Sequence, residues 1–262
     1  MKSYARLITI VAASFLLSAC AGAKTGVLPD GTLSTNLRPA VSIKANAPFA
    51  LADAGRVWAS PKTDMLPGST DASFDYAVYA DPSSSPASVF AYAAILRLTD
   101  NESWEFLPQG NGLPGVFGGR QGEASVRSGY IYTLHVPASN DWASELLAAN
   151  GVTVPEAWIA KRWLFSLDTD ARALAEYREP WPEGLDVPGG SDVMLLGESQ
   201  AAFLRDFERR AVAAFSFAPV PGNFENVVPR VSAWKKAPVL PNVEKLMGDV
   251  IQKDFGNDIY ND

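Results

Sequence analysis

Hydrophobic and polar residues alternate along much of this chain with a period of two, which is typical of β-strands. Most of the segments with this pattern are rich in aromatic or β-branched residues and are bounded by Gly, Pro, Asn, Asp or Ser. They are 41–44, 56–59, 74–79, 88–98, 124–136, 158–167 and 171–179. Shorter apolar runs at 192–196 and 211–218 are also predicted to be strands. Segment 88–98 suits a helix nearly as well because of its alanines, although a strand is the preferred interpretation.

Three segments instead have helical spacing: 138–150, 199–210 and 242–255. In the first, Trp142, Leu146 and Leu147 form an apolar stripe, Asn140 or Ser139 is a candidate N-cap, and Gly151 follows as a stop signal. Because strands outnumber helices and hairpin-length connections dominate, the pattern predicts an α+β fold with a mostly antiparallel sheet and about three helices. We expect one globular domain over 40–235. A proline-containing spacer, a helix and an acidic tail occupy 236–262.

The first 19 residues have the organisation of a signal peptide. Lys2 and Arg6 precede an apolar stretch from Leu7 to Leu17. That stretch is shorter than the roughly 20 apolar residues that a membrane-spanning helix needs. We therefore expect residues 1–19 to be removed.

The stretch Leu17-Ser18-Ala19-Cys20 contains the only cysteine of the chain, and it resembles the lipobox of bacterial lipoproteins. The resemblance implies that the Cys20 thiol carries diacylglycerol and that the leader is cleaved before Cys20. It also implies that the new amino terminus is acylated, for example by palmitate. An ordinary signal peptide with a chance cysteine is the alternative. The rest of the chain resembles small bacterial envelope lipoprotein families of unknown function.

Residues 20–39 follow as an expected lipidated flexible tether, rich in Gly, Ala, Thr and Ser. Such a tether holds the body some tens of ångströms from the membrane. Ala21 stands where lipoproteins retained on an inner membrane often have Asp, which favours the outer membrane. The expected location is thus the cell membrane or outer membrane, with the soluble body facing the periplasm.

The net charge, the apolar content and the cysteine count restrict which partners and which stabilising interactions are expected. The chain has a formal charge of −7, which disfavours nucleic acid and anionic surfaces as partners. Apolar residues make up 47% of the sequence, enough for a core. No disulfide is expected, since no second cysteine exists. The core must therefore be held together by burial alone.

Two residues are candidates for catalysis. His135 is the only histidine, so any Ser-His-Asp chemistry or histidine-bound metal depends on it. The segment Gly197-Glu198-Ser199-Gln200-Ala201 resembles the nucleophile elbow of α/β-hydrolases. In that family the histidine follows the serine, and the last position is usually glycine, so this chain departs twice from the pattern. We therefore favour Ser199 as a helix cap and His135 as a half-exposed strand residue, with a serine hydrolase as the alternative.

Other short motifs are interpreted as local structure. Gly110–Gly115 matches the dinucleotide pattern G-x-G-x-x-G, but no helix is predicted after it, so 109–123 is expected to be a glycine-rich loop. Asp168-Thr169-Asp170 is expected to be a turn rather than a calcium site. Asp254-Phe255-Gly256 matches a kinase tripeptide by chance. No metal or cofactor is expected.

The sequence thus predicts a membrane-anchored envelope lipoprotein with a non-catalytic binding or structural role. The membrane is the first expected partner, and an envelope protein or peptide the second. Seven tryptophans favour an exposed groove or apolar patch of several hundred Å². The oligomeric state and the partner's identity stay open.

Overall fold

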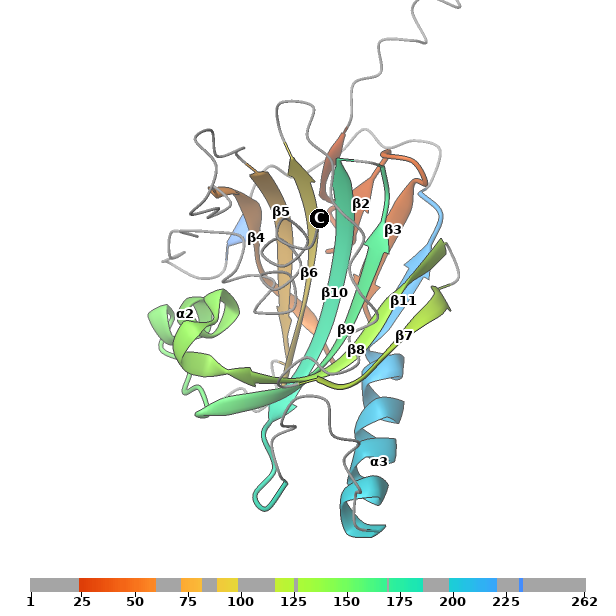
Figure 1. Cartoon of the computed structure of the whole chain (residues 1–262). Coiled ribbons are helices and arrows are strands. Elements are labelled where there is room, and N and C mark those ends of the chain that lie inside the picture. The colour runs from red at the N-terminus through yellow and green to blue at the C-terminus, as the bar shows by residue number, and fades with distance from the viewer. Residues whose placement is uncertain are drawn as a thin grey trace, which may run out of the picture.

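The computed structural model of the chain describes residues 24–59, 72–81, 89–98, 116–124, 127–168, 170–185, 198–220 and 231–232. In this part of the chain, two antiparallel sheets pack face to face, and helices lie outside them (Figure 1). The prediction of a mostly antiparallel, sheet-dominated α+β fold is confirmed. Two α-helices occur within these ranges, whereas the predicted third, 242–255, lies outside them.

The small sheet has the strand order β1-β2-β3-β11. Its strands are β1 (Thr25–Val27), β2 (Leu33–Thr35), β3 (Val41–Ala45) and β11 (Phe215–Ala218). The large sheet has the order β12-β4-β5-β6-β10-β9-β8-β7. Its strands are β12 (Val231–Ser232), β4 (Ala50–Ala59), β5 (Ala72–Ala80), β6 (Phe90–Leu98), β10 (Ala171–Pro180), β9 (Ala157–Ser166), β8 (Arg127–Pro137) and β7 (Val116–Ala124). The helical elements are η1 (Ala138–Asn140), α2 (Trp142–Ala149) and α3 (Glu198–Ala214).

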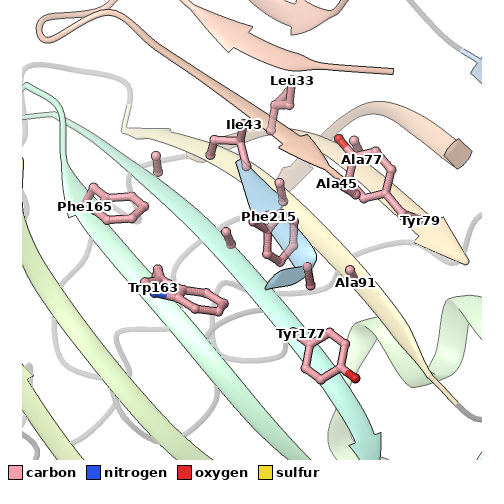
Figure 2. Close-up of a cluster of buried hydrophobic side chains, with 14 of the residues drawn as sticks. Leu33, Ile43, Ala45, Ala77, Tyr79, Ala91, Trp163, Phe165, Tyr177 and Phe215 are labelled. Atoms are coloured by element: carbon pink, nitrogen blue, oxygen red, sulfur yellow. The ribbon is translucent and has the colours of Figure 1, made fainter. Parts of the chain in front are cut away.

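The main core lies between the two sheets. Figure 2 shows Leu33, Ile43 and Phe215 of the small sheet opposite aromatic residues of the large sheet. The rings of Trp163 and Phe215 meet edge to face with centroids 5.8 Å apart. Apolar burial of this kind is the dominant favourable term in folding, and this core must supply it without disulfides.

A second core lies on the other face of the large sheet, under α2. Alternate residues of β6 divide between the two cores: Ala91 and Ala93 face the small sheet, whereas Phe90 and Tyr92 face α2. Both faces of β6 are therefore buried. This explains why 88–98 is almost continuously apolar, a pattern that suits a helix as well as a strand.

The segment expected to be a flexible tether is largely part of the folded body. Strands β1 and β2 lie within 24–39, and Val27, Leu33 and Leu37 are buried in the main core. This corrects the predicted boundary at residue 40. Three-residue strands are too short to show a period of two, and they form here because β2 pairs with both β1 and β3.

The glycine-rich stretch also differs from expectation. Residues 116–124 form β7, which pairs with β8 through a register shift between Val116 and Gly118. Glycine weakens a strand because it offers no side chain for packing and loses much backbone entropy. Residues 116–124 form a strand because β8 supplies backbone hydrogen-bond partners, which the local sequence does not predict. The G-x-G-x-x-G motif itself lies outside the described residues.

Both described helices differ in detail from their predictions. Asp141, not Asn140 or Ser139, caps α2, since its carboxylate accepts a 2.8 Å hydrogen bond from the Ser144 amide. Gly151 follows with φ +81°, the left-handed conformation expected after a helix. Helix α3 extends to Ala214, so the predicted strand 211–218 begins only at Phe215.

Several predictions fall outside the described residues: the signal peptide and lipobox, strand 192–196, the spacer, helix and tail over 236–262, and the tripeptide 254–256. Within the described ranges, no helix is long and apolar enough to span a membrane.

Candidate functional site

Cys20, the expected lipidation site, also lies outside the described residues, but the folded body begins very close to it. The backbone amide of Lys24 donates a 2.6 Å hydrogen bond to Asn36 Oδ1, and β1 starts at the next residue. Only three residues therefore separate Cys20 from the first described residue.

His135 lies on β8, opposite Ile159 of β9. Its imidazole is half-buried and meets the Trp181 indole edge to face, with ring centroids 4.5 Å apart. Burial lowers the pKa of His135 below its ordinary value because it disfavours the charged imidazolium. Within the described residues, no carboxylate hydrogen-bonds to this imidazole.

Ser199 lies in the first turn of α3, and its side chain is exposed. Since the helix begins at Glu198, Ser199 follows the cap position that we expected it to occupy. The buried face of the helix consists of Phe207, Ala211 and Ala214, which pack into the main core.

Segment 181–185 contacts His135 at one end and Gln200, the neighbour of Ser199, near the other. Trp181 contacts His135 and donates a 2.9 Å hydrogen bond to the Leu185 carbonyl oxygen. Gln200, next to Ser199, donates to the Gly184 carbonyl oxygen at 3.1 Å. The fold thus brings His135 and Ser199 to the same end of the body. Within the described residues, however, neither hydrogen-bonds to the other, and no acid orients the imidazole as a triad requires.

The lowered pKa of His135 predicts a pH dependence of stability. Below its ordinary pKa of 6.5, the unfolded chain binds a proton that the folded chain resists, so the free energy of unfolding falls with falling pH. The fall in the free energy of unfolding ends once the pH is below the pKa that His135 has in the folded state. His135→Gln is expected to remove this contribution. Urea unfolding of both proteins from pH 8 to pH 5 tests this, and identical pH slopes would contradict it.

A cluster of four buried charges lies under α2. This ionic cluster consists of Asp141, Arg162, Glu176 and Arg178, all at most 4% exposed. Arg178 donates from Nη1 to Asp141 Oδ2 at 2.5 Å and from Nη2 to Asp141 Oδ1 at 2.9 Å. Nε of Arg178 and Nε of Arg162 each donate to the Glu176 carboxylate. Two cations thus balance two anions.

Neighbouring aromatic residues complete the surroundings of Arg178. Its guanidinium lies over the rings of Phe90 and Tyr92, 5.4 and 5.2 Å from their centroids. Burial alone lowers the pKa of Arg178, but the Asp141 and Glu176 carboxylates outweigh it and hold the pKa well above its ordinary value. Arg178 is therefore a permanent cation within the fold.

The ionic cluster also positions α2. Ser144 Oγ donates to the capping carboxylate of Asp141 at 2.7 Å and accepts from Trp158 Nε1 at 2.8 Å. One carboxylate therefore holds both the helix N-terminus and β10. This arrangement links structural elements and is closed to solvent, so we interpret it as structural rather than catalytic.

Sequence reasoning missed the ionic cluster. Its members on β9 and β10 share one face of the sheet, since Arg162 pairs with Glu176 across the strands. Charged residues at alternate positions usually indicate a solvated sheet face. The available signal was the alternation of charged residues with other residues in β9 and β10. Both strands carry apolar residues on both faces, which is typical of strands that are buried on both sides.

Ion pairs also fasten α3 to the large sheet. Arg210 forms two hydrogen bonds, of 2.6 and 2.8 Å, with the Glu179 carboxylate, which also accepts from Tyr177 Oη at 2.5 Å. Lys161 pairs with Glu208 at 2.7 Å. Helix α3 is therefore fixed by polar contacts beside its apolar face.

The four tryptophans whose exposure is described do not form an exposed patch. Trp142, Trp158 and Trp163 are buried in the two cores, and Trp181 is half-buried. Among residues whose exposure is described, Val212 is the one large hydrophobic side chain that is clearly exposed. In this part of the chain, aromatic residues stabilise the fold instead of offering an apolar binding surface.

A short connection joins β9 to β10, as expected, and the Ala171 amide donates to the Asp168 carbonyl oxygen at 3.3 Å. Asp170 pairs with Arg97 at 2.9 Å. The described residues contain no group of three His, Cys, Asp or Glu side chains placed to hold a metal ion.

Comparisons with known proteins add no relative: no protein-family model, no curated protein and no solved structure matches this chain.

Proposed function

We propose that this protein is an envelope lipoprotein anchored through acylated Cys20, with a body that serves a non-catalytic binding or structural role. The observation that supports this proposal is the position of the sole cysteine, which directly follows a signal-peptide-like leader and ends a lipobox-like tetrapeptide. Two or more acyl chains hold a protein stably on a membrane, whereas one gives marginal affinity.

The described surroundings of His135 and Ser199 favour a non-catalytic role. A serine nucleophile needs a base within hydrogen-bond reach, and a histidine base needs an orienting group. Here His135 packs against Trp181, and Ser199 is exposed on α3. An envelope protein or peptide is the proposed partner. Because Val212 is the one large hydrophobic side chain that is clearly exposed among residues of described exposure, we expect polar contacts to dominate recognition of the partner.

The proposed anchor predicts the effect of Cys20→Ala. In a bacterial host that processes lipoproteins, the parent protein is expected to incorporate radiolabelled palmitate and to sediment with membranes. Cys20→Ala is expected to lose the label and to leave the membrane fraction almost completely, because no thiol remains to be acylated.

Ala23→Ser, outside the lipobox, is the matched control and is expected to behave like the parent. A parent protein without label, or a Cys20→Ala variant that still carries it, would contradict the proposed anchor.

A further inference from the structure

We propose that one end of the body lies against the lipid headgroups of the bilayer that holds Cys20. This anchor end comprises Lys24, the turn 36–40 of the small sheet, and Asp168 and Asp170 between β9 and β10 of the large sheet. The inference rests on the proposed acylation of Cys20, and it adds which surface faces the membrane.

The pairing of strands brings these segments to one end. Thr25 pairs with Thr35, so Lys24 lies beside the turn after β2. At the opposite end, Tyr79 Oη donates to the Gly31 carbonyl oxygen, which joins the β1–β2 turn to the last residues of β5. The first residue of β5, Ala72, pairs with Leu98, whose amide donates to the backbone carbonyl oxygen of Asp170. Asp168 and Asp170 are therefore at the end of the body that holds Lys24, and α3 projects from the other (Figure 1).

The length of chain between Cys20 and Lys24 limits how far this end can move from the bilayer. Four residue steps of at most about 3.6 Å span no more than about 14 Å. Strand β10 has 10 residues, so the body extends about 30 Å along this strand at about 3.4 Å per residue. The body is thus roughly twice as long as the reach of its tether. Its far end cannot replace the anchor end at the headgroups.

Charge favours the same orientation. Lys24 and Arg38 at the anchor end are exposed, and neither forms an ion pair with another described residue. The anchor end also exposes Asp168, so Lys24 and Arg38 leave a small positive excess there. The far end exposes Glu183 and Glu198 together with Arg205 and Arg209 of α3, and the chain as a whole is acidic. Anionic headgroups attract the two cations and repel the acidic remainder. An acidic body can therefore rest on an anionic bilayer through this end.

Fluorescence quenching in vesicles tests the orientation. Acylation consumes the only native thiol, so Arg38→Cys, Asp168→Cys and Glu183→Cys each introduce one thiol for a fluorophore. The lipidated proteins are reconstituted into vesicles that contain phosphatidylglycerol and a headgroup-nitroxide lipid. We expect severalfold stronger quenching at positions 38 and 168 than at position 183.

Equal quenching at the three positions, or stronger quenching at 183, would overturn the inference while leaving the anchor intact. A protein that carries no lipid on Cys20 would overturn the anchor and the inference together. Acylation is measured separately by mass spectrometry, so the two failures are distinguishable.

A long Gly-Ser insertion between Ala23 and Lys24 separates the effect of the short tether on the orientation from the effect of charge. In neutral vesicles it is expected to reduce quenching at position 168, whose label leaves Lys24 and Arg38 in place, to the level seen at 183, because the tether no longer restrains the body. Anionic vesicles are expected to restore part of the quenching. Undiminished quenching in neutral vesicles would overturn the tether argument, and equal quenching in both vesicle types would overturn the contribution of charge.

Discussion

Arg178→Met is expected to destabilise the folded body by about 3–5 kcal/mol, because it leaves the buried Asp141 carboxylate without its cation and Glu176 with Arg162 alone. Arg178 is fully buried and bonds to Asp141 and Glu176. Methionine fills much of the arginine volume, so most of the loss comes from charge and hydrogen bonding rather than from a cavity. Domains of ordinary size have only about 5–15 kcal/mol of stability in total.

Denaturant unfolding, followed by circular dichroism, measures this loss. Arg209→Met is the matched control, since Arg209 is 77% exposed and pairs with Asp206 on the surface of α3. Exposed pairs contribute about 0–1 kcal/mol. A loss at Arg178 no larger than that at Arg209 would show that the ionic cluster is not what holds α2 to the sheet.

A second substitution separates loss of charge balance from general disruption. Asp141→Asn keeps an oxygen that can cap α2 but removes the negative charge beside position 178. In the Arg178→Met background, this change is expected to recover part of the lost stability. Further loss would instead indicate that the Asp141 charge stabilises α2 through its cap even without Arg178.

Trp142→Ala is expected to cost about 3–5 kcal/mol, the usual range for emptying a fully buried aromatic site. Trp142 is 0% exposed, and its indole meets the Tyr76 ring edge to face with centroids 4.9 Å apart. Helix α2 has 8 residues, far fewer than the roughly 12–15 at which an isolated helix becomes marginally stable. Its helicity thus depends on packing, and we expect the helix to separate from the sheet.

Hydrogen exchange of the α2 amides measures this separation, alongside global unfolding in denaturant. Val212→Ala is the control, because Val212 is 59% exposed and its truncation removes little buried area. Retained protection of the Leu146 and Leu147 amides in Trp142→Ala would refute the dependence of α2 on this indole.

Five of the longer strands were predicted correctly from alternation or from an enrichment in apolar and aromatic residues between turn signals. Strands β5, β6, β8, β9 and β10 all lie on predicted segments. For β8, β9 and β10, the limits agree within a few residues. Pairing of β9 with β10 through a short turn was also expected, since two alternating segments flank Asp168 and Asp170.

The candidate site was predicted less well. His135 lies in a strand and is half-buried, as expected, but its contact with Trp181 joins residues 46 positions apart in sequence. Ser199 was predicted to cap a helix that in fact begins one residue earlier. Apart from the alternation of charged residues in β9 and β10, the ionic cluster has no local signature, because Asp141 and Arg178 meet only when α2 packs on β10.

The sequence by itself indicated strands β5, β6, β8, β9 and β10, the positions of helices α2 and α3, and the expected place of the anchor, because each has a local residue pattern or a short contiguous motif. Tertiary structure alone decided that 24–39 joins the small sheet, that glycine-rich 116–124 forms a strand, and that four charges are buried beneath α2. Short strands and buried charges are stabilised by partners distant in the chain, so their own sequence carries little trace of them.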